Sequence, residues 1–218
     1  EWGTGERGDF PHFMLKEIYE QPEALRQCLR GRIQSDIGTA KLGGLDLSPR
    51  DTGNISSVTL LGCGTSYYAA KVGAQAIERL AGIPARAEIS SEFRHSNPIV
   101  DQNALFFAVS QSGETSDTLG AIKEVKIKGG KVMGVINVVG STIARECGRG
   151  VYIHSGPEMA VASTKAFSNM IAATYLFALQ AARNRGLSIS DGQSFARELQ
   201  AIPDKVERYF QNPGNIDP

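Results

Sequence analysis

The sequence predicts an α/β fold: a doubly wound, five-stranded parallel sheet flanked by helices, with an N-terminal helical extension. Five short apolar runs alternate with helix-like segments from residue 58 onward, which is the order expected for parallel sheets. The runs are apolar at successive positions, as is typical of parallel strands buried on both faces. Loops rich in small and hydroxyl residues follow two of these runs, where such sheets bind ligands.

The first 54 residues predict an extension ahead of this sheet. Residues 1–12 are rich in glycine and charge, which indicates a linker cut from a longer chain. Residues 13–32 show apolar residues mostly at helical spacing, and Pro22 should begin a second helical piece. Residues 35–54 mix Gly, Ser, Asp and Pro, so we expect a loop that holds at most a short turn. The extension and its loop therefore span 13–54.

The rest of the chain divides into alternating elements. We expect strands at 58–61, 85–89, 104–109, 132–136 and 151–153. We expect helices at 66–81, 115–128, 141–146, 163–182 and 191–210. The last helix has an apolar face formed by Phe195, Leu199, Ile202, Val206 and Phe210. No internal repeat or second domain of comparable size interrupts this order, so we place one domain at 55–210 and a loop-like tail at 211–218.

Composition and charge exclude several classes of protein. Of the 218 residues, 41% are hydrophobic and 21% charged, as in a globular domain with a sizeable core. Lys plus Arg and Asp plus Glu each total 23, so no basic excess points to nucleic acid or to a membrane surface. No apolar run approaches the roughly 20 residues of a membrane span. Local groups, not a global field, must capture any anionic ligand.

The cysteines and histidines predict neither disulfides nor a metal site. Cys28, Cys63 and Cys147 form no CxxC pair and no zinc spacing. An odd, sparse set of cysteines suits the reducing cytoplasm. His12 and His154 are isolated, and His95 lies in an expected polar turn with Glu92 and Arg94. We expect no bound metal, and we place this polar cluster at the surface or at an interface.

Three loops have the composition of an anion site. They are Gly62–Ser66 after the first strand, Ser110–Thr115 after the third, and Val161–Lys165 before the long helix. Small residues let the backbone approach a ligand, and free N–H groups at helix starts attract anions. Hydroxyl groups add further donors. Ser110–Thr115 therefore suits a phosphate ester without needing formal charge.

Simpler roles compete with this hypothesis. Any one hydroxyl could only cap its helix, although Ser110, Ser112 and Thr115 supply more donors than one cap needs. Cys63 is more often a packing residue than a nucleophile, and Glu114 would usually serve the helix dipole. Lys165 could contact an anion or pair with an acid. Neither GxGxxG nor a Walker A loop is present, which disfavours dinucleotides and nucleoside triphosphates.

Several stretches together resemble the sugar isomerase (SIS) family, and within it the bacterial glutamine–fructose-6-phosphate aminotransferases. The resemblance runs from about Phe10 to Phe210. It rests on His12–Pro22, Gly62–Ser66, Ser110–Thr115 and Val161–Phe167, with support from Ala81–Pro84 and Ser91–Arg94.

The resemblance implies a phosphosugar site and no cofactor. It implies that Ser110, Gln111, Ser112 and Thr115 hold the phosphate of fructose 6-phosphate or glucosamine 6-phosphate. Thr65 and Ser66 would line the same pocket, and Val161 and Ser163 would border the sugar. These aminotransferases take ammonia from glutamine and isomerise the product sugar, without metal, nicotinamide or pyridoxal.

The resemblance covers only the first SIS half of such an enzyme. The glutaminase domain and the second SIS half, which carries the Lys, Glu and His of catalysis, have no counterpart here, so we assign no catalytic residue. A chain of this kind should bind the sugar without turnover. The family also implies a homodimer, for which the long helix from Ser163 offers apolar side chains on several sides. They are Phe167, Met170, Ile171, Tyr175, Leu176 and Phe177.

Two other functions stay open. A regulatory SIS domain that senses a sugar phosphate would usually carry a DNA-binding helix-turn-helix, and no basic N-terminal module is present. A stand-alone sugar-phosphate isomerase would need its own base. Activity of the chain in an isomerase assay would distinguish the latter from an aminotransferase half.

Overall fold

The computed structural model describes residues 5–211. The expected linker, residues 1–12, is described from residue 5, and residues 5–12 contain no helix or strand. The expected tail, residues 211–218, lies outside the described residues except for Gln211. Within the described part of the chain, no helix has both the length and the apolar character needed to cross a bilayer.

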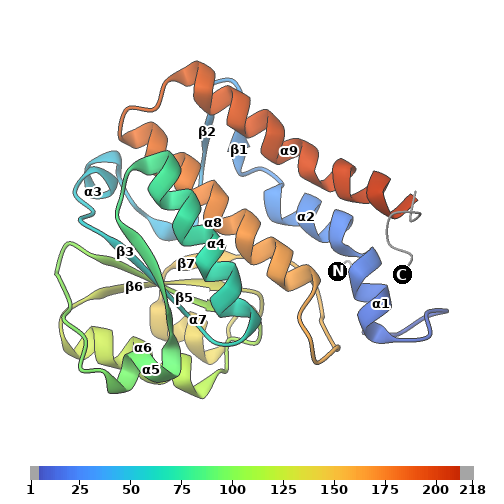
Figure 1. Ribbon diagram of the computed structural model, residues 1–218, viewed down its shortest axis with the longest axis horizontal. Coiled ribbons are helices and arrows are strands. Elements are labelled where there is room, and N and C mark those ends of the chain that lie inside the picture. Colours follow the sequence, from blue (N-terminus) through green and yellow to red (C-terminus); the bar gives the residue numbers. More distant parts are fainter. Residues whose placement is uncertain (1–4, 212–218) are drawn as a thin grey trace.

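The centre of the fold is a five-stranded parallel sheet, as predicted (Figure 1). Its strands, in spatial order, are β4 (Ala85–Ile89), β3 (Val58–Gly62), β5 (Leu105–Ser110), β6 (Lys131–Ile136) and β7 (Gly150–Tyr152). Every neighbouring pair is parallel. The three most apolar runs form the adjacent strands β3, β5 and β6, and all residues of β3 and β5 are buried, as the apolar runs predicted for strands covered on both faces.

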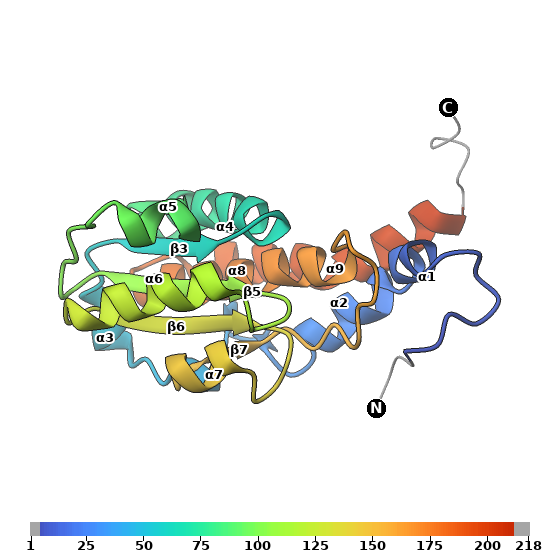
Figure 2. The same cartoon turned by 90° about the horizontal axis from the view of Figure 1, so that it is seen from below.

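Helices cover both faces of the sheet (Figure 2). The helices that follow β3 in the sequence are α4 (Thr65–Ala81), α5 (Ser90–His95), α6 (Ser116–Ile127), α7 (Thr142–Cys147), α8 (Lys165–Asn184) and α9 (Ile189–Gln211). One face packs against α4 and α8, with Phe107 of β5 contacting Phe177 of α8 at 4.9 Å between ring centroids. The other face packs against α5, α6 and α7. The three-layer arrangement expected from the alternation is therefore confirmed.

The N-terminal extension packs through α2 against both α8 and α9. Its helices are α1 (Phe13–Tyr19) and α2 (Gln21–Leu29), and Pro22 lies in the first turn of α2, so the predicted break is confirmed. The following segment was expected to be a loop with at most one short turn. It instead contains β2 (Thr39–Ala40), the 3-10 helix η1 (Gly43–Leu45) and α3 (Pro49–Gly53), and β1 (Ile33–Gln34), which pairs with β2, lies directly before it. Elements of two to five residues are too short to produce a detectable period.

The sequence analysis also missed α5, which it expected to be a polar turn around His95. The helix begins directly after β4, and it buries Phe93 against Phe106 with ring centroids 6.0 Å apart. A single apolar residue in six gives no helical period. Tertiary packing of Phe93, not the local pattern, therefore explains why this segment is a helix.

The long helix α8 is an internal element, and this corrects one expectation. Met170, Leu176 and Phe177 were expected to form a surface between two copies of the chain. They are buried within the chain, where α8 packs against α4, α2 and α9. The fold places this helix between the sheet and the extension, which covers these three residues, whereas Phe167, Ile171 and Tyr175 are only half-buried.

The strand order fixes where a ligand would bind. Numbered from β3, the order is 2-1-3-4-5, the flavodoxin-like arrangement. The chain leaves β3 toward one side of the sheet and resumes at β5 on the other side. The C-terminal ends of β3 and β5 therefore flank a switch point, where open parallel sheets bind their ligands. Gly62–Ser66 and Ser110–Thr115 begin at these two ends.

The contact between α4 and α8 generates a prediction about stability. A Cβ on Gly73 of α4 would lie 2.6 Å from Oγ1 of the buried Thr174 of α8. We expect Gly73→Ala to lower the free energy of unfolding by about 1–2 kcal/mol, because overpacking costs about 1–3 kcal/mol and helix propensity returns up to about 1 kcal/mol. Denaturant unfolding measures this change.

Gly120→Ala in α6 is the matched control, because the three atoms nearest to its Cβ would all belong to the flexible guanidinium of Arg94. We expect it to be neutral or slightly stabilising. Adding Thr174→Ala should recover the loss that the packing clash of Gly73→Ala causes. Equal effects of Gly73→Ala and Gly120→Ala would contradict the proposed tight contact.

Candidate functional site

The turn after β5 brings its hydroxyl groups together. Ser110 is only 2% exposed, and its Oγ accepts a 3.0 Å hydrogen bond from the Gly113 N–H and lies 3.4 Å from Oγ1 of Thr115. Ser112 is exposed, and its Oγ accepts a 3.2 Å bond from the Glu114 N–H. Thr115 is the N-cap residue of α6 but makes no side-chain capping bond. Capping of α6 therefore does not explain these hydroxyl groups.

The same turn is fixed from outside by the start of α7. The Ile143 N–H donates a 2.8 Å bond to the Gly113 carbonyl, and the Thr142 N–H donates a 2.8 Å bond to Oε1 of Glu114. Gly113 has φ +68°, and a Cβ there would lie 2.0 Å from Oγ of Ser141. Only glycine fits this conformation and this space. The turn is therefore held in place before any ligand arrives.

In the loop after β3, backbone groups and not a side chain surround the N-terminus of α4. Gly64 is the N-cap residue with φ +55°, and it has no side chain to cap the first turn. A Cβ on Gly62 would lie 2.9 Å from the Ser66 carbonyl carbon, so glycine lets the strand and helix approach closely. Thr65 is half-buried and Ser66 is buried. The N–H groups of this helix start thus point to the same edge of the sheet as the Ser110 turn.

Contacts between first turns join the ends of three strands. Sγ of Cys63, after β3, lies 3.9 Å from Oγ1 of Thr118 in α6. The Thr118 hydroxyl donates a 3.1 Å bond to Oγ of Ser90, which follows β4. The two predicted segments are thus neighbours across the switch point. Cys63 contacts a hydroxyl here, in agreement with a packing role.

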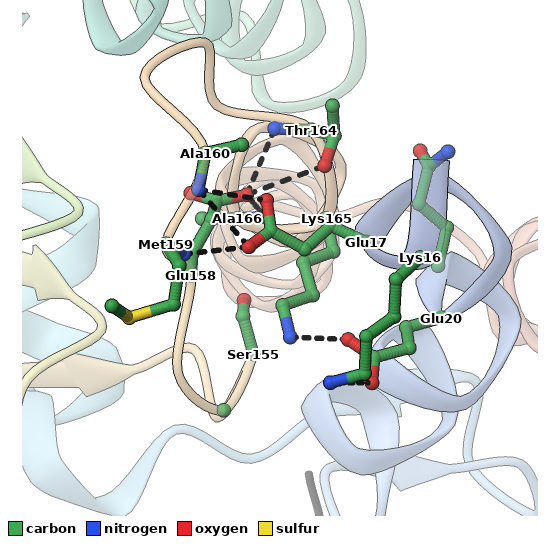
Figure 3. Close-up of polar contacts among 12 residues, drawn as sticks. Lys16, Glu17, Glu20, Ser155, Glu158, Met159, Ala160, Thr164, Lys165 and Ala166 are labelled. Atoms are coloured by element: carbon green, nitrogen blue, oxygen red, sulfur yellow. Dashed lines mark hydrogen bonds and ion pairs between the residues drawn. The ribbon is translucent and has the colours of Figure 1, made fainter. Parts of the chain in front are cut away.

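The third predicted segment has another partner. Oε1 of Glu158 accepts bonds from the N–H groups of Thr164 at 2.8 Å and Ala166 at 3.2 Å, and Oε2 accepts a 2.9 Å bond from the Ser163 hydroxyl (Figure 3). A carboxylate of the chain itself therefore occupies the start of α8, where the composition had indicated an anion site. Val161 is fully exposed nearby. Its contact with a sugar, and that of Ser163, stay predictions.

Lys165 pairs with an acid. Its side chain is 1% exposed, and Nζ lies 2.6 Å from Oε2 of Glu20 in the extension. Oε1 of the same carboxylate lies 3.0 Å from Nζ of Lys16 (Figure 3). Of the two roles left open for Lys165, the structure shows the ion pair.

A hollow elsewhere on the surface offers a contrasting environment. It has a volume of about 560 Å³ and lies beside β4 and α5, where Arg86, Glu88, Glu92 and Asp101 line it. Three acids against one base make it unfavourable for a phosphate. Within residues 5–211, no three His, Cys, Asp or Glu side chains gather as a metal site would require.

Comparison with known families shows which family the chain belongs to. The family model described as the SIS domain matches residues 54–180, more than half of the chain. The chain belongs to the SIS domain family. The matched region contains β3 to β7 and both loops at the switch point, and it stops within α8. It leaves out α1 and α2.

Individual relatives are longer than this SIS chain. It is 45% identical over 207 residues to the glutamine–fructose-6-phosphate aminotransferase (isomerising) of Symbiobacterium thermophilum, with 94% of this chain and 34% of the relative covered. The enzyme of that name from Thermus thermophilus is also 45% identical, with 95% and 34% covered. The chain therefore spans about a third of the length of these curated relatives.

A solved structure is similar along nearly the whole chain. The C-terminal domain of glucosamine-fructose-6-phosphate aminotransferase from Francisella tularensis superposes with a TM-score of 0.88 at 32% identity. The match covers 97% of this chain and 59% of that one. Since the match extends over nearly the whole chain, the extension also has a counterpart in that structure.

Three residues that support the site were not found from the sequence. Asn137 bonds the backbone of Ser155 at 2.8 Å and of Gly156 at 2.9 Å. Glu158 holds the start of α8, and Glu17 of α1 accepts bonds from the Met159 and Ala160 N–H groups. An acid shortly before a Ser-Thr helix start could have indicated Glu158. Nothing local links Glu17 with a loop 142 residues away.

The contact of Glu114 with α7 generates a pH prediction. Hydrogen bonding from Thr142, with a smaller effect of the Arg145 charge, lowers the pKa of Glu114 below its usual 4.5. A lowered folded-state pKa contributes stability that is present above about pH 4.5 and lost as pH falls through the folded value. We therefore expect Glu114→Gln to be less stable than the unmodified chain at neutral pH and to approach it in acid. Urea unfolding from pH 7 to pH 3 measures this, and a difference that grows toward acid would contradict it.

Proposed function

We propose that the chain is the first SIS half of a glutamine–fructose-6-phosphate aminotransferase and that it binds fructose 6-phosphate and glucosamine 6-phosphate. The observation that carries the proposal is the pre-formed Ser110–Thr115 turn at the switch point of the sheet. The names of the relatives at 45% identity support the choice of sugar. They also favour this function over a sensor domain or a stand-alone isomerase.

In this proposal, different predicted residues contact the phosphate and the sugar of the ligand. Four residues, Ser110, Gln111, Ser112 and Thr115, surround the phosphate. Thr65 and Ser66 line the pocket from the start of α4, and Val161 and Ser163 border the sugar. Phosphate oxygens accept hydrogen bonds, and the hydroxyl groups of these named residues and the backbone N–H groups at the starts of α4 and α6 donate them.

The energetics predict modest affinity. A hydrogen bond to a charged group contributes about 1.5–3 kcal/mol, and several of them must offset an association cost of about 4–15 kcal/mol. The remainder corresponds to dissociation constants between about micromolar and millimolar. Because this half supplies no group for imine formation or proton transfer, we expect it to bind without turnover. Catalysis would need the second SIS half, and ammonia would come from the glutaminase domain.

We also propose the partners and the cellular location of the chain. The partners are the second SIS half and the glutaminase domain of the enzyme, and a second copy in a cytoplasmic homodimer. Within α8, Met170, Leu176 and Phe177 are already buried, so a homodimer that used this helix would contact its half-buried residues Phe167, Ile171 and Tyr175. We also propose that the SIS domain extends to residue 210, because α9 packs Leu199 into the same core as α8.

Ser112→Ala tests the phosphate site. Ser112 is exposed, so its loss should change stability little. Loss of one charge-assisted bond should weaken fructose 6-phosphate binding about tenfold to a hundredfold in a calorimetric titration.

Ser116→Ala is the matched control, because Ser116 is also exposed but lies within the first turn of α6 rather than in the Ser110 turn. The affinity of Ser116→Ala for fructose 6-phosphate should stay within about twofold of that of the unmodified chain. If Ser112→Ala binds as tightly as Ser116→Ala, the phosphate does not bind at this turn.

A further inference from the structure

A twelve-residue segment, 153–164, connects the sheet to α8 without any helix or strand. Loops of this length in a compact domain are usually functional. This one carries Val161 and Ser163, the two residues expected to border the sugar. Its conformation therefore decides whether they face the ligand.

Three side chains hold this segment. Asn137 bonds its beginning at Ser155 and Gly156, and Glu158 holds its end at the start of α8. The middle is held by Glu17, whose Oε1 accepts bonds from the Met159 N–H at 2.5 Å and from the Ala160 N–H at 3.1 Å (Figure 3). Val161 follows directly after this third anchor.

Glu17 differs from the other two anchors because it lies outside the matched SIS region. It belongs to α1, and its side chain is 2% exposed. Burial of a carboxylate is unfavourable unless hydrogen bonds or charges compensate it. The compensation comes from two backbone N–H groups of the loop, so the buried carboxylate and the loop conformation depend on each other.

The neighbouring contacts keep α1 in place for this role. Glu20, one turn further on, pairs with the buried Lys165 at 2.6 Å, and the Ser168 hydroxyl donates a 2.5 Å bond to Oε1 of Gln21. The junction between α1 and α2 is therefore fastened to the first turn of α8. Glu17 lies between this junction and the loop.

We propose that Glu17 is a positioning residue of the sugar-phosphate site, holding the Met159–Ala160 backbone so that Val161 and Ser163 face the sugar. This proposal rests on the proposed function. It makes the N-terminal extension a working part of the site, although the SIS family region begins only at residue 54. In the described part of the chain, Glu17 accepts its hydrogen bonds from Met159 and Ala160 and not from the Ser110–Thr115 turn, so the proposed role of Glu17 concerns the sugar and not the phosphate.

The test compares Glu17→Gln and Glu17→Ala with the unmodified chain. Gln keeps one acceptor oxygen, whereas Ala keeps none. Glu6→Gln is the matched control, because it removes the same charge from the exposed segment before α1. Should Glu17→Ala fail to fold, Glu17→Gln still answers the question.

The first measurement is amide hydrogen exchange of the ligand-free chain. We expect the amides of Met159 and Ala160 to exchange about tenfold faster in Glu17→Gln and faster still in Glu17→Ala, with the strand amides of β5 unchanged. Glu6→Gln should match the unmodified chain. Unchanged exchange at residues 158–163 in both Glu17 variants would overturn the proposal.

The second measurement is calorimetric titration with fructose 6-phosphate and, separately, with inorganic phosphate. A positioning role predicts that fructose 6-phosphate binds about threefold to tenfold more weakly in Glu17→Gln while inorganic phosphate binds equally well. Equal weakening of both ligands would indicate a general structural role and overturn the proposal. If the unmodified chain binds neither ligand, the proposed function fails, whereas the exchange data still show whether Glu17 holds the loop.

Discussion

The parallel pairing of β3 with β5 is the constraint on which the rest of the structure depends. In register, Leu61 lies opposite Ala108, so the two strands end side by side. In the sequence, β4 comes after β3 and before β5, but in the sheet it lies on the other side of β3. The ends of β3 and β5 therefore also form the switch point of the sheet. The starts of α4 and α6 consequently converge on one edge, with their N–H groups and hydroxyls. The proposed anion site at this edge would rely on local dipoles, since the chain has no excess of basic residues.

Support for this edge comes from segments that are distant in the sequence. The start of α7 holds the phosphate turn through Gly113 and Glu114, and the N-terminal extension holds the loop before α8 through Glu17. At the start of α8, the Glu158 carboxylate accepts hydrogen bonds from N–H groups that would otherwise attract an anion. This arrangement fixes the Ser110–Thr115 turn, which is the proposed phosphate site, and the segments around it. The buried pair of Lys165 with Glu20 belongs to this support.

Local pattern was enough to predict the sheet, its flanking helices and the hydroxyl-rich turn, because apolar runs and glycine stops are properties of neighbouring residues. It was insufficient wherever long-range packing decides the outcome. Phe93 makes α5 a helix by packing on Phe106, although its segment has no period. Met170, Leu176 and Phe177 of α8 were assigned to a second copy because the sequence could not show that they are buried within the chain. Glu17 stayed hidden for the same reason, since its partners are far along the chain.

The most direct test of the central claim is a crystal structure of this chain grown with fructose 6-phosphate. The account predicts the phosphate within hydrogen-bond distance of the Ser110–Thr115 turn, with the sugar extending toward Thr65 and Val161. A phosphate bound at the start of α8 in place of the Glu158 carboxylate, or in the hollow beside Arg86, would contradict it.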